Sequence, residues 1–233
     1  MTALAFQHYF ADQTSLGALD EFGYIDVDSS FYGGLSRSTY DLYDGELTTT
    51  TRILGGEYIQ NNLVLGVSNL NVVFGYDGES ESNSATQLSL GYLINDNLVI
   101  KANYWDRGEG LDISAQYSHQ LTGNDYIGFT LESNDSLDYL ALSSTYFKDL
   151  GKDQYLRLNV NAEDILDFEV ESLNLSADYY FTAKTSVSIA LSGYTEDWTA
   201  IAAKHYFNQN VAFYAELAND DEDSVTIGLS GHF

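Results

Sequence analysis

The chain has 233 residues, with 9 basic and 35 acidic side chains and a formal net charge of −26 at pH 7. A chain this acidic would be repelled by phosphate backbones, so nucleic acid is not expected as a partner. The absence of cysteine excludes a disulfide framework and thiolate metal sites. An apolar fraction of 44% argues against the disorder that strong acidity otherwise suggests.

No stretch approaches the roughly 20 apolar residues that a transmembrane helix needs, and no basic and apolar leader marks a signal peptide. Two interpretations remain: a cytosolic chain, or the mature form of an exported chain whose signal peptide was replaced by Met1. Met1 is the only methionine, which fits the second interpretation.

The N-terminal region predicts one strand followed by an irregular stretch. Residues 3–10 alternate and end in an aromatic pair, as a strand would. Within residues 11–29, Leu16, Leu19 and Phe22 lie three apart, which suits an irregular or short helical segment better than strict alternation. The alternative is a continuous strand over residues 17–26.

From residue 30 onward the periodicity is almost everywhere two, which indicates strands with unlike faces. The predicted strands are about 9–13 residues long, whereas an ordinary globular strand has about 5–6. Short polar turns, such as residues 60–62 and 182–185, alternate with longer acidic loops, such as residues 77–84 and 219–224. The cycle predicts an up-and-down meander of hairpins.

Such a meander fits a soluble β-protein or a membrane barrel whose apolar faces meet lipid and whose polar faces line a wet lumen. Aromatic motifs precede several turns (residues 8–10, 145–147, 178–181 and 204–207), as in the girdles of membrane barrels. We therefore predict a single domain over residues 1–233, an all-β transmembrane antiparallel barrel of about 14–16 strands. Residues 11–29 would lie on its periplasmic side.

The last strand is expected to close this barrel, because an open edge cannot sit in hydrocarbon. Val225, Ile227 and Leu229 would face lipid, and the chain ends in Phe233. This ending resembles the C-terminal signal of bacterial outer-membrane proteins, which implies the barrel-assembly machinery as a partner. Gly231 departs from the aromatic residue often found there.

Three further stretches extend the resemblance: "YFADQTSLGALDEFGYIDVDSSFYGGLSR", "LSADYYFTAKTSVSIALSGY" and "AAKHYFNQNVAFYAEL". They are similar to a family of outer-membrane general porins of marine gammaproteobacteria. In that family an early strand ends in a tyrosine–phenylalanine pair, and an irregular segment and a long strand follow. Counting strands backwards from a periplasmic C-terminus gives 15. That odd number implies either a missing first strand or a sixteenth strand over residues 17–26.

Candidate site residues are mainly charged. The residues expected to line the pore are Arg37, Arg52, Lys101, Glu132, Arg157, Asp178 and Glu216. The acids expected in loops at the mouth are Asp77, Glu79, Glu81, Asp220, Asp221, Glu222 and Asp223. The four histidines (His8, His119, His205 and His232) have no metal-ligand spacing, so no metal and no cofactor are expected.

The leading hypothesis is a passive diffusion channel of the outer membrane for small hydrophilic solutes and ions, cation-preferring and not an enzyme. The expected partners are outer-membrane lipids and lipopolysaccharide, with a monomer or a homo-oligomer both open. Two alternatives are an adhesive or structural barrel with a plugged lumen and a membrane-embedded hydrolase. Basic residues facing lumenal acids would either create a transverse field or only neutralise one another.

Overall fold

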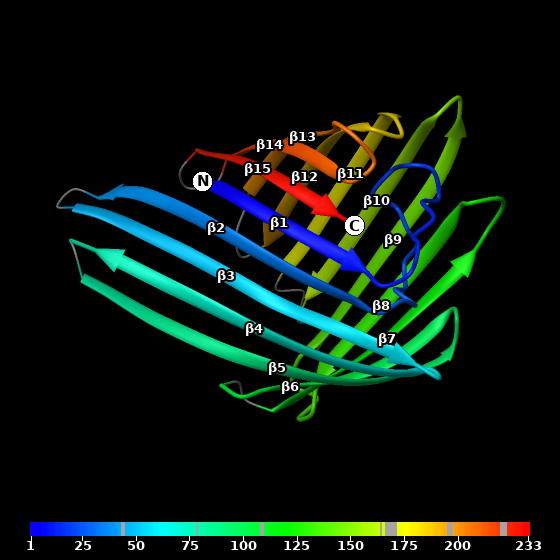
Figure 1. Cartoon of the computed structure of the whole chain (residues 1–233), viewed down its shortest axis with the longest axis horizontal. Coiled ribbons are helices and arrows are strands. Elements are labelled where there is room, and N and C mark those ends of the chain that lie inside the picture. The colour runs from blue at the N-terminus through cyan, green and yellow to red at the C-terminus, as the bar shows by residue number, and fades with distance from the viewer. Residues whose placement is uncertain are drawn as a thin grey trace.

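The computed structural model describes residues 1–42, 45–77, 79–107, 110–163, 165, 172–194, 198–219 and 223–233. Within these residues the chain is all β, with no helix, and its strands form one closed barrel of 15 strands (Figure 1). No described helix is long and apolar enough to cross a membrane.

The strands follow one another around the barrel in chain order. Their bounds are β1 Thr2–Tyr9, β2 Ser30–Leu42, β3 Gly45–Gln60, β4 Leu63–Tyr76, β5 Glu79–Asn95, β6 Leu98–Trp105, β7 Leu111–Gln120, β8 Tyr126–Asn134, β9 Leu140–Gly151, β10 Gln154–Glu163, β11 Ser172–Thr182, β12 Thr185–Tyr194, β13 Trp198–Tyr206, β14 Val211–Asn219 and β15 Ser224–His232. Short connections such as Asn61–Asn62 gather at one end of the barrel, which we call the short-turn end. The opposite end, which includes the turn at Asp77 between β4 and β5, is called the acidic-loop end.

The barrel closes through a parallel seam, which corrects the expectation of a purely antiparallel barrel. β1 pairs with β15 in parallel, with Leu4 opposite Leu229, and every other neighbouring pair is antiparallel. An odd number of strands requires this, because the first and last strands then run in the same direction. Residues 17–26 form no strand, so the sixteen-strand alternative is wrong.

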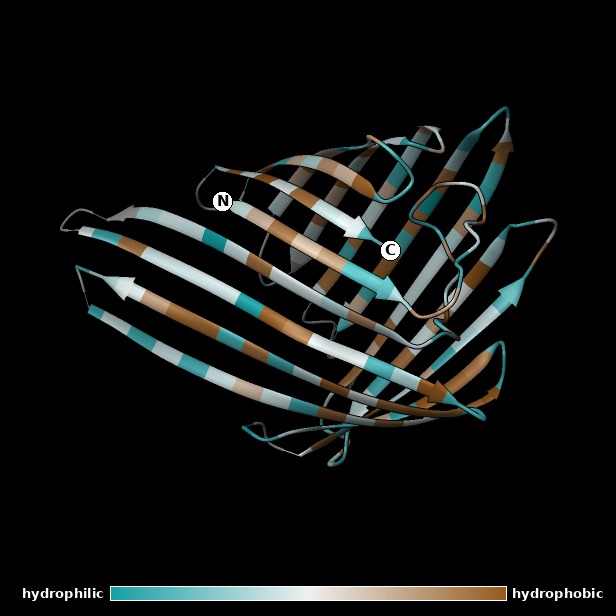
Figure 2. Cartoon of the chain, viewed as in Figure 1, coloured by the Kyte–Doolittle hydropathy of each residue, from teal (hydrophilic) through white to brown (hydrophobic). Residues whose placement is uncertain are grey.

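The two faces of the wall differ as the alternation predicts. On β15, Val225, Ile227 and Leu229 are 51%, 48% and 44% exposed, whereas Thr226, which points inward, is 8% exposed. No second sheet covers the apolar face within the described residues, so the prediction for this strand is confirmed. Figure 2 shows brown apolar bands alternating with pale and teal ones along the strands.

Strands β2–β5 are longer than the others, with 13, 16, 14 and 17 residues. Their outward positions change character part of the way along. Val67 on β4 is 54% exposed and apolar, but Asn69 and Asn71, the next two outward residues, donate hydrogen bonds to serines of β5. The outer face of these strands therefore becomes polar towards the acidic-loop end.

Residues 10–29, here called the lumenal segment, connect β1 to β2 and have irregular backbone. They form neither a strand nor a helix, so the expected irregularity is present and the helical alternative is wrong. Figure 1 shows this segment looping at the end of the barrel where β1 ends and the C-terminus lies. The three-residue spacing of its apolar side chains reflects packing against the wall, as described next.

Candidate lumenal constriction

The lumenal segment is fixed to turns of the short-turn end on distant parts of the wall. The amide of Leu19 donates to the carbonyl of Ala183, between β11 and β12, at 2.9 Å. The side chain of Asn124, between β7 and β8, donates to the carbonyl of Leu16 at 2.8 Å. Because these turns lie many strands away from β1, the segment crosses the short-turn end of the barrel.

Apolar side chains of the segment pack into two clusters on the inner wall. Ala18 is fully buried among Tyr126, Phe147, Tyr155 and Tyr180. The second cluster consists of Ile25 with Val64, Leu93 and Val99. Removing these side chains from water stabilises the docked segment by roughly 25 cal/mol for each Å² of apolar area buried.

The aromatic motifs supply part of this packing, because neighbouring residues of a strand point to opposite faces. In the motif at residues 178–181, Tyr180 is 3% exposed and points inward, whereas Phe181 is 49% exposed and points outward. The motif at residues 204–207 divides in the same way between Tyr206 and Phe207, at 4% and 63% exposed. Each motif thus contributes rings to both the outer surface and the lumen.

Tyr24 of the segment lies over a glycine of β8. Its hydroxyl is 2.6 Å from the hydroxyl of Thr130. A Cβ atom at Gly128 would overlap the ring of Tyr24. Glycine is therefore required here for close approach rather than for an unusual backbone angle.

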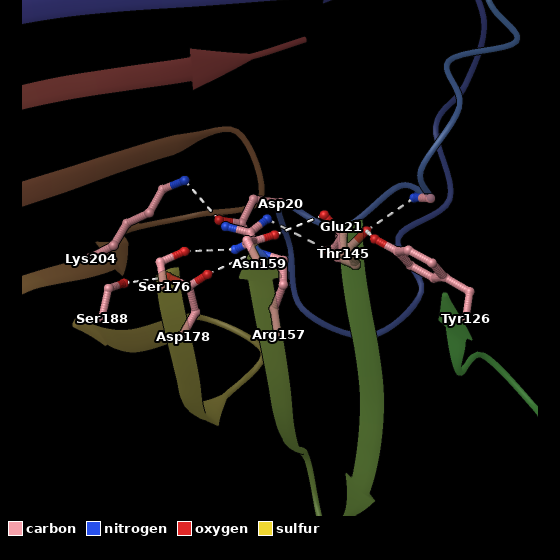
Figure 3. Close-up of polar contacts among 11 residues, drawn as sticks. Asp20, Glu21, Tyr126, Thr145, Arg157, Asn159, Ser176, Asp178, Ser188 and Lys204 are labelled. Carbon is pink, nitrogen blue, oxygen red and sulfur yellow. Dashed lines mark hydrogen bonds and ion pairs between the residues drawn. The ribbon is translucent and has the colours of Figure 1, made fainter. Parts of the chain in front are cut away.

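Ion pairs connect the segment to two more strands (Figure 3). Asp20 accepts a hydrogen bond from the ammonium of Lys204, on β13, at 2.8 Å. Arg157 on β10 lies between two acids: its Nε is 2.8 Å from Asp178 of β11, and its Nη1 is 3.6 Å from Glu21 of the segment. Glu21 also accepts a hydrogen bond from the hydroxyl of Tyr126 at 2.7 Å.

Another ion pair joins two strands of the wall. Lys101 of β6 donates to both carboxylate oxygens of Glu57 on β3, at 2.8 and 2.9 Å. A cavity of about 310 Å³ borders this pair together with Asp20 and Asp26. A second cavity of about 420 Å³, lined by Asp20 and Lys204 among others, lies against β1, β2 and β15. The segment thus leaves open space beside it.

Three of the five acids in the segment, Asp20, Glu21 and Asp26, have shifted pKa values. Burial raises the pKa of Glu21 and outweighs the opposing effects of Tyr126 and Arg157. Burial also raises the pKa of Asp26, and the nearby carboxylate of Glu57 adds to this rise. Burial would raise the pKa of Asp20 too, but the ion pair with Lys204 prevails and lowers it.

Further acids project into the lumen from the strands. Glu132 on β8 lies in the electrostatic field of Asp112 and Glu163, both of which also point inward. Glu216 on β14 is opposite the inward-facing Thr226. None of these four acids lies within ion-pair distance of a basic side chain in the described part of the chain.

Two basic residues expected in the lumen lie on the outer face instead. In the register of β2 and β3, Arg52 is directly opposite Leu35, which is 46% exposed, and Arg37 is two residues further along β2 on the same face. The expectation for these two residues was wrong because it placed every polar strand residue in the lumen. Here β2 and β3 extend beyond the apolar band of the outer face, and their outward residues there are polar. Lys101, Arg157 and Asp178 do point inward.

The expected mouth acids also differ in position. Asp77 lies in the turn between β4 and β5, but Glu79 and Glu81 are part of β5 itself, so their assignment to a loop is wrong. Asp223 directly precedes β15. The remaining mouth acids, Asp220, Asp221 and Glu222, lie outside the described residues.

The histidines lie near the short-turn end but do not converge. His232 contacts the rings of Phe22 and Tyr206 at centroid distances of 5.2 and 5.5 Å. His205 is close to Thr185 on the next strand, at 2.9 Å. In the described ranges, no group of three or more metal-ligating side chains could hold a metal ion.

Sequence reasoning missed the most connected residues of the constriction, namely Asp20, Glu21 and Lys204. Asp20 and Lys204 are 184 residues apart, so no local pattern relates them. One signal was present in the sequence: Lys204 is two residues before Tyr206, so both side chains lie on the same face of the strand.

Two comparisons with known proteins found matches. A family model described as "Putative general bacterial porin" matches residues 2–228. A solved structure described as "Asymmetric conductivity of engineered proteins" aligns with 94% of this chain and 93% of its own, at 13% identity and a TM-score of 0.44. No curated protein matches. Because the family model spans nearly the whole chain, the chain belongs to the general bacterial porin family.

Proposed function

We propose that this porin is an outer-membrane diffusion channel that favours small cations, and that the lumenal segment sets its narrowest part. The short-turn end would face the periplasm, as short turns do in bacterial barrels. Small hydrophilic solutes would enter between the acidic loops and pass the segment through the space beside it.

The charge balance of the lumen is the observation that supports the cation preference. Each of the three inward-facing bases has an acidic partner: Lys101 with Glu57, Arg157 with Asp178, and Lys204 with Asp20. The lumenal acids Asp26, Asp112, Glu132, Glu163 and Glu216 have no such partner among the described residues. The mean potential along the path would therefore be negative, which concentrates cations and depresses the entry of anions.

The position of each acid decides how much it contributes to the cation preference. An acid in a loop is screened by salt within about 8 Å at physiological ionic strength. Screening is weaker for Glu132 and Glu216, because the wall around them excludes part of the solvent. Each should affect selectivity more than an acid outside the lumen.

Reversal potentials in planar bilayers under a potassium chloride gradient test this proposal. The double variant Glu132→Gln/Glu216→Gln should lower the cation-to-anion permeability ratio more than the control Asp77→Asn/Asp223→Asn, which removes the same charge from two connections at the acidic-loop end. An unchanged ratio in the first variant would mean that these acids do not border the ion path.

A second candidate function is a closed barrel that works only through its outer loops. The packing of the lumenal segment against the wall favours it, since Ala18 and Ile25 leave little space at their positions. The same bilayer measurement separates the two functions. Insertion without stepwise conductance at any voltage would support the closed barrel and reject the channel.

A further inference from the structure

Arg37 and Arg52 form an outward-facing pair at the edge of the apolar band. They lie on the neighbouring strands β2 and β3. Arg37 is opposite Thr50 and Arg52 is opposite Leu35, so the two arginines are diagonal neighbours on one face. Diagonal neighbours of this kind are about 7–8 Å apart, within reach of long side chains.

These two arginines differ from the lumenal bases in having no acidic partner among the described side chains. Both are exposed, and in the described ranges no carboxylate lies within ion-pair distance of either guanidinium. The chain holds 35 acids against 9 bases, yet two like charges stand side by side here without neutralisation. Two like charges at this separation repel each other, so an anion bound between them would relieve the repulsion.

The surroundings indicate where that anion would be. On the side of the short-turn end, the same face carries Leu35 and Leu54, which are 46% and 62% exposed and suited to acyl chains. On the other side lies a depression of about 490 Å³, lined by Arg37 with Thr48, Thr50 and Glu46 among others. The arginines therefore mark the level at which hydrocarbon gives way to polar headgroups.

From this geometry we infer that Arg37 and Arg52 bind the phosphate of a phosphorylated glycolipid in the membrane leaflet at the acidic-loop end. Guanidinium groups bind phosphate oxygens in paired, charge-assisted hydrogen bonds. The hydroxyls of Thr48 and Thr50 and the carboxylate of Glu46 can exchange hydrogen bonds with the sugar hydroxyls of such a headgroup. This site does not depend on ion conduction through the lumen.

Native mass spectrometry of the detergent-purified protein tests the inference. The probes are lipid A with both phosphates and the same lipid after dephosphorylation. The wild-type protein should retain the phosphorylated lipid preferentially. The variant Arg37→Gln/Arg52→Gln should bind it about tenfold more weakly, as expected when two charge-assisted contacts are lost at a partly hydrated surface.

The control is Lys148→Gln/Lys152→Gln, which removes the same charge at the short-turn end and should retain wild-type affinity. Equal retention of the two lipids by the wild type would overturn the inference, and that comparison needs no variant to fold. Equal losses of lipid affinity in the arginine and lysine variants would also overturn the inference, because they would show a general effect of charge. Complete displacement of the lipid by millimolar inorganic phosphate would also reject a lipid site in favour of a simple anion site.

Discussion

Arg157 joins the lumenal segment to the wall, so its replacement should loosen the segment. In Arg157→Gln, Glu21 would lose its basic partner while remaining buried, since its side chain is only 3% exposed. Asp178 belongs to the wall and would keep its hydrogen bond from Ser188. The loss would therefore affect the docking of the segment more than the barrel itself.

The magnitude lies between two limits. Breaking a fully buried ion pair costs about 3–5 kcal/mol, whereas an exposed pair contributes about 0–1 kcal/mol. Arg157 is 30% exposed and lies 3.6 Å from Glu21, so we expect docking to weaken by about 2 kcal/mol. Because about 1.4 kcal/mol corresponds to a factor of ten, the undocked population should rise roughly 30-fold.

The absence of cysteine from the chain provides a direct assay. Ala18 is fully buried when the segment is docked, so the cysteine of Ala18→Cys reacts with a maleimide only after undocking. Its reaction rate should rise roughly 30-fold when Arg157→Gln is added. Arg52→Gln, which removes a base from the outer face, serves as the control and should leave the rate unchanged. A rate in Arg157→Gln equal to that of the control would refute the role of this ion pair.

Three further outcomes are expected. Gly128→Val should displace the ring of Tyr24 and weaken docking by about 2 kcal/mol, which is typical of overpacking. Both the rate at which maleimide modifies Ala18→Cys and the single-channel conductance should rise. An unchanged conductance would show that the segment does not limit the ion path. Acidification from pH 7 to about 5 should tighten docking, because the raised pKa values of Glu21 and Asp26 mean that the docked state binds protons more strongly than the undocked state. Asp20, whose pKa is lowered by docking, opposes this effect only at lower pH. The reaction of Ala18→Cys with a disulfide reagent, normalised to Thr14→Cys, should slow over this range, and Glu21→Gln/Asp26→Asn should abolish the effect. Ile227→Lys should cost about 2–4 kcal/mol in lipid and reduce the heat-resistant folded form on gels, whereas the inward-facing Ser230→Lys should not.

The alternation of apolar and polar residues predicted the faces of the wall along its apolar outer band. Val225, Ile227 and Leu229 follow it, because their exposed side chains are apolar whereas their neighbours in sequence point into the lumen. Arg37 and Arg52 do not follow it, although their spacing from neighbouring leucines indicated that they face outward. Arg37 is two residues from Leu35, and Arg52 is two residues from Leu54, so each arginine must share a face with a leucine.

The contacts of the lumenal segment could not be predicted, for a different reason. Alternation describes the two faces of one strand, but it does not say which strands meet across the lumen. The pairing of Asp20 with Lys204 depends on the closure of the whole barrel, and so does the burial of Ala18 among rings from β8 to β11. The residues that dock the segment in the lumen are therefore those on which local sequence is least informative.

The parallel seam and the lumenal segment are physically related. β1 has 8 residues and pairs with both β15 and β2. A short turn after Tyr9 would suffice to join it to β2, as short turns join the other strands at this end. The chain instead places 20 residues, Phe10 to Ser29, between them, and their apolar side chains are held by rings and aliphatic groups of β4 to β11. The segment thus connects the seam side of the barrel to the far wall through Ala18 and Ile25. Undocking the segment should loosen the seam as well, because Tyr9 at the end of β1 would lose its contacts with Phe22 and Asp26 of the segment.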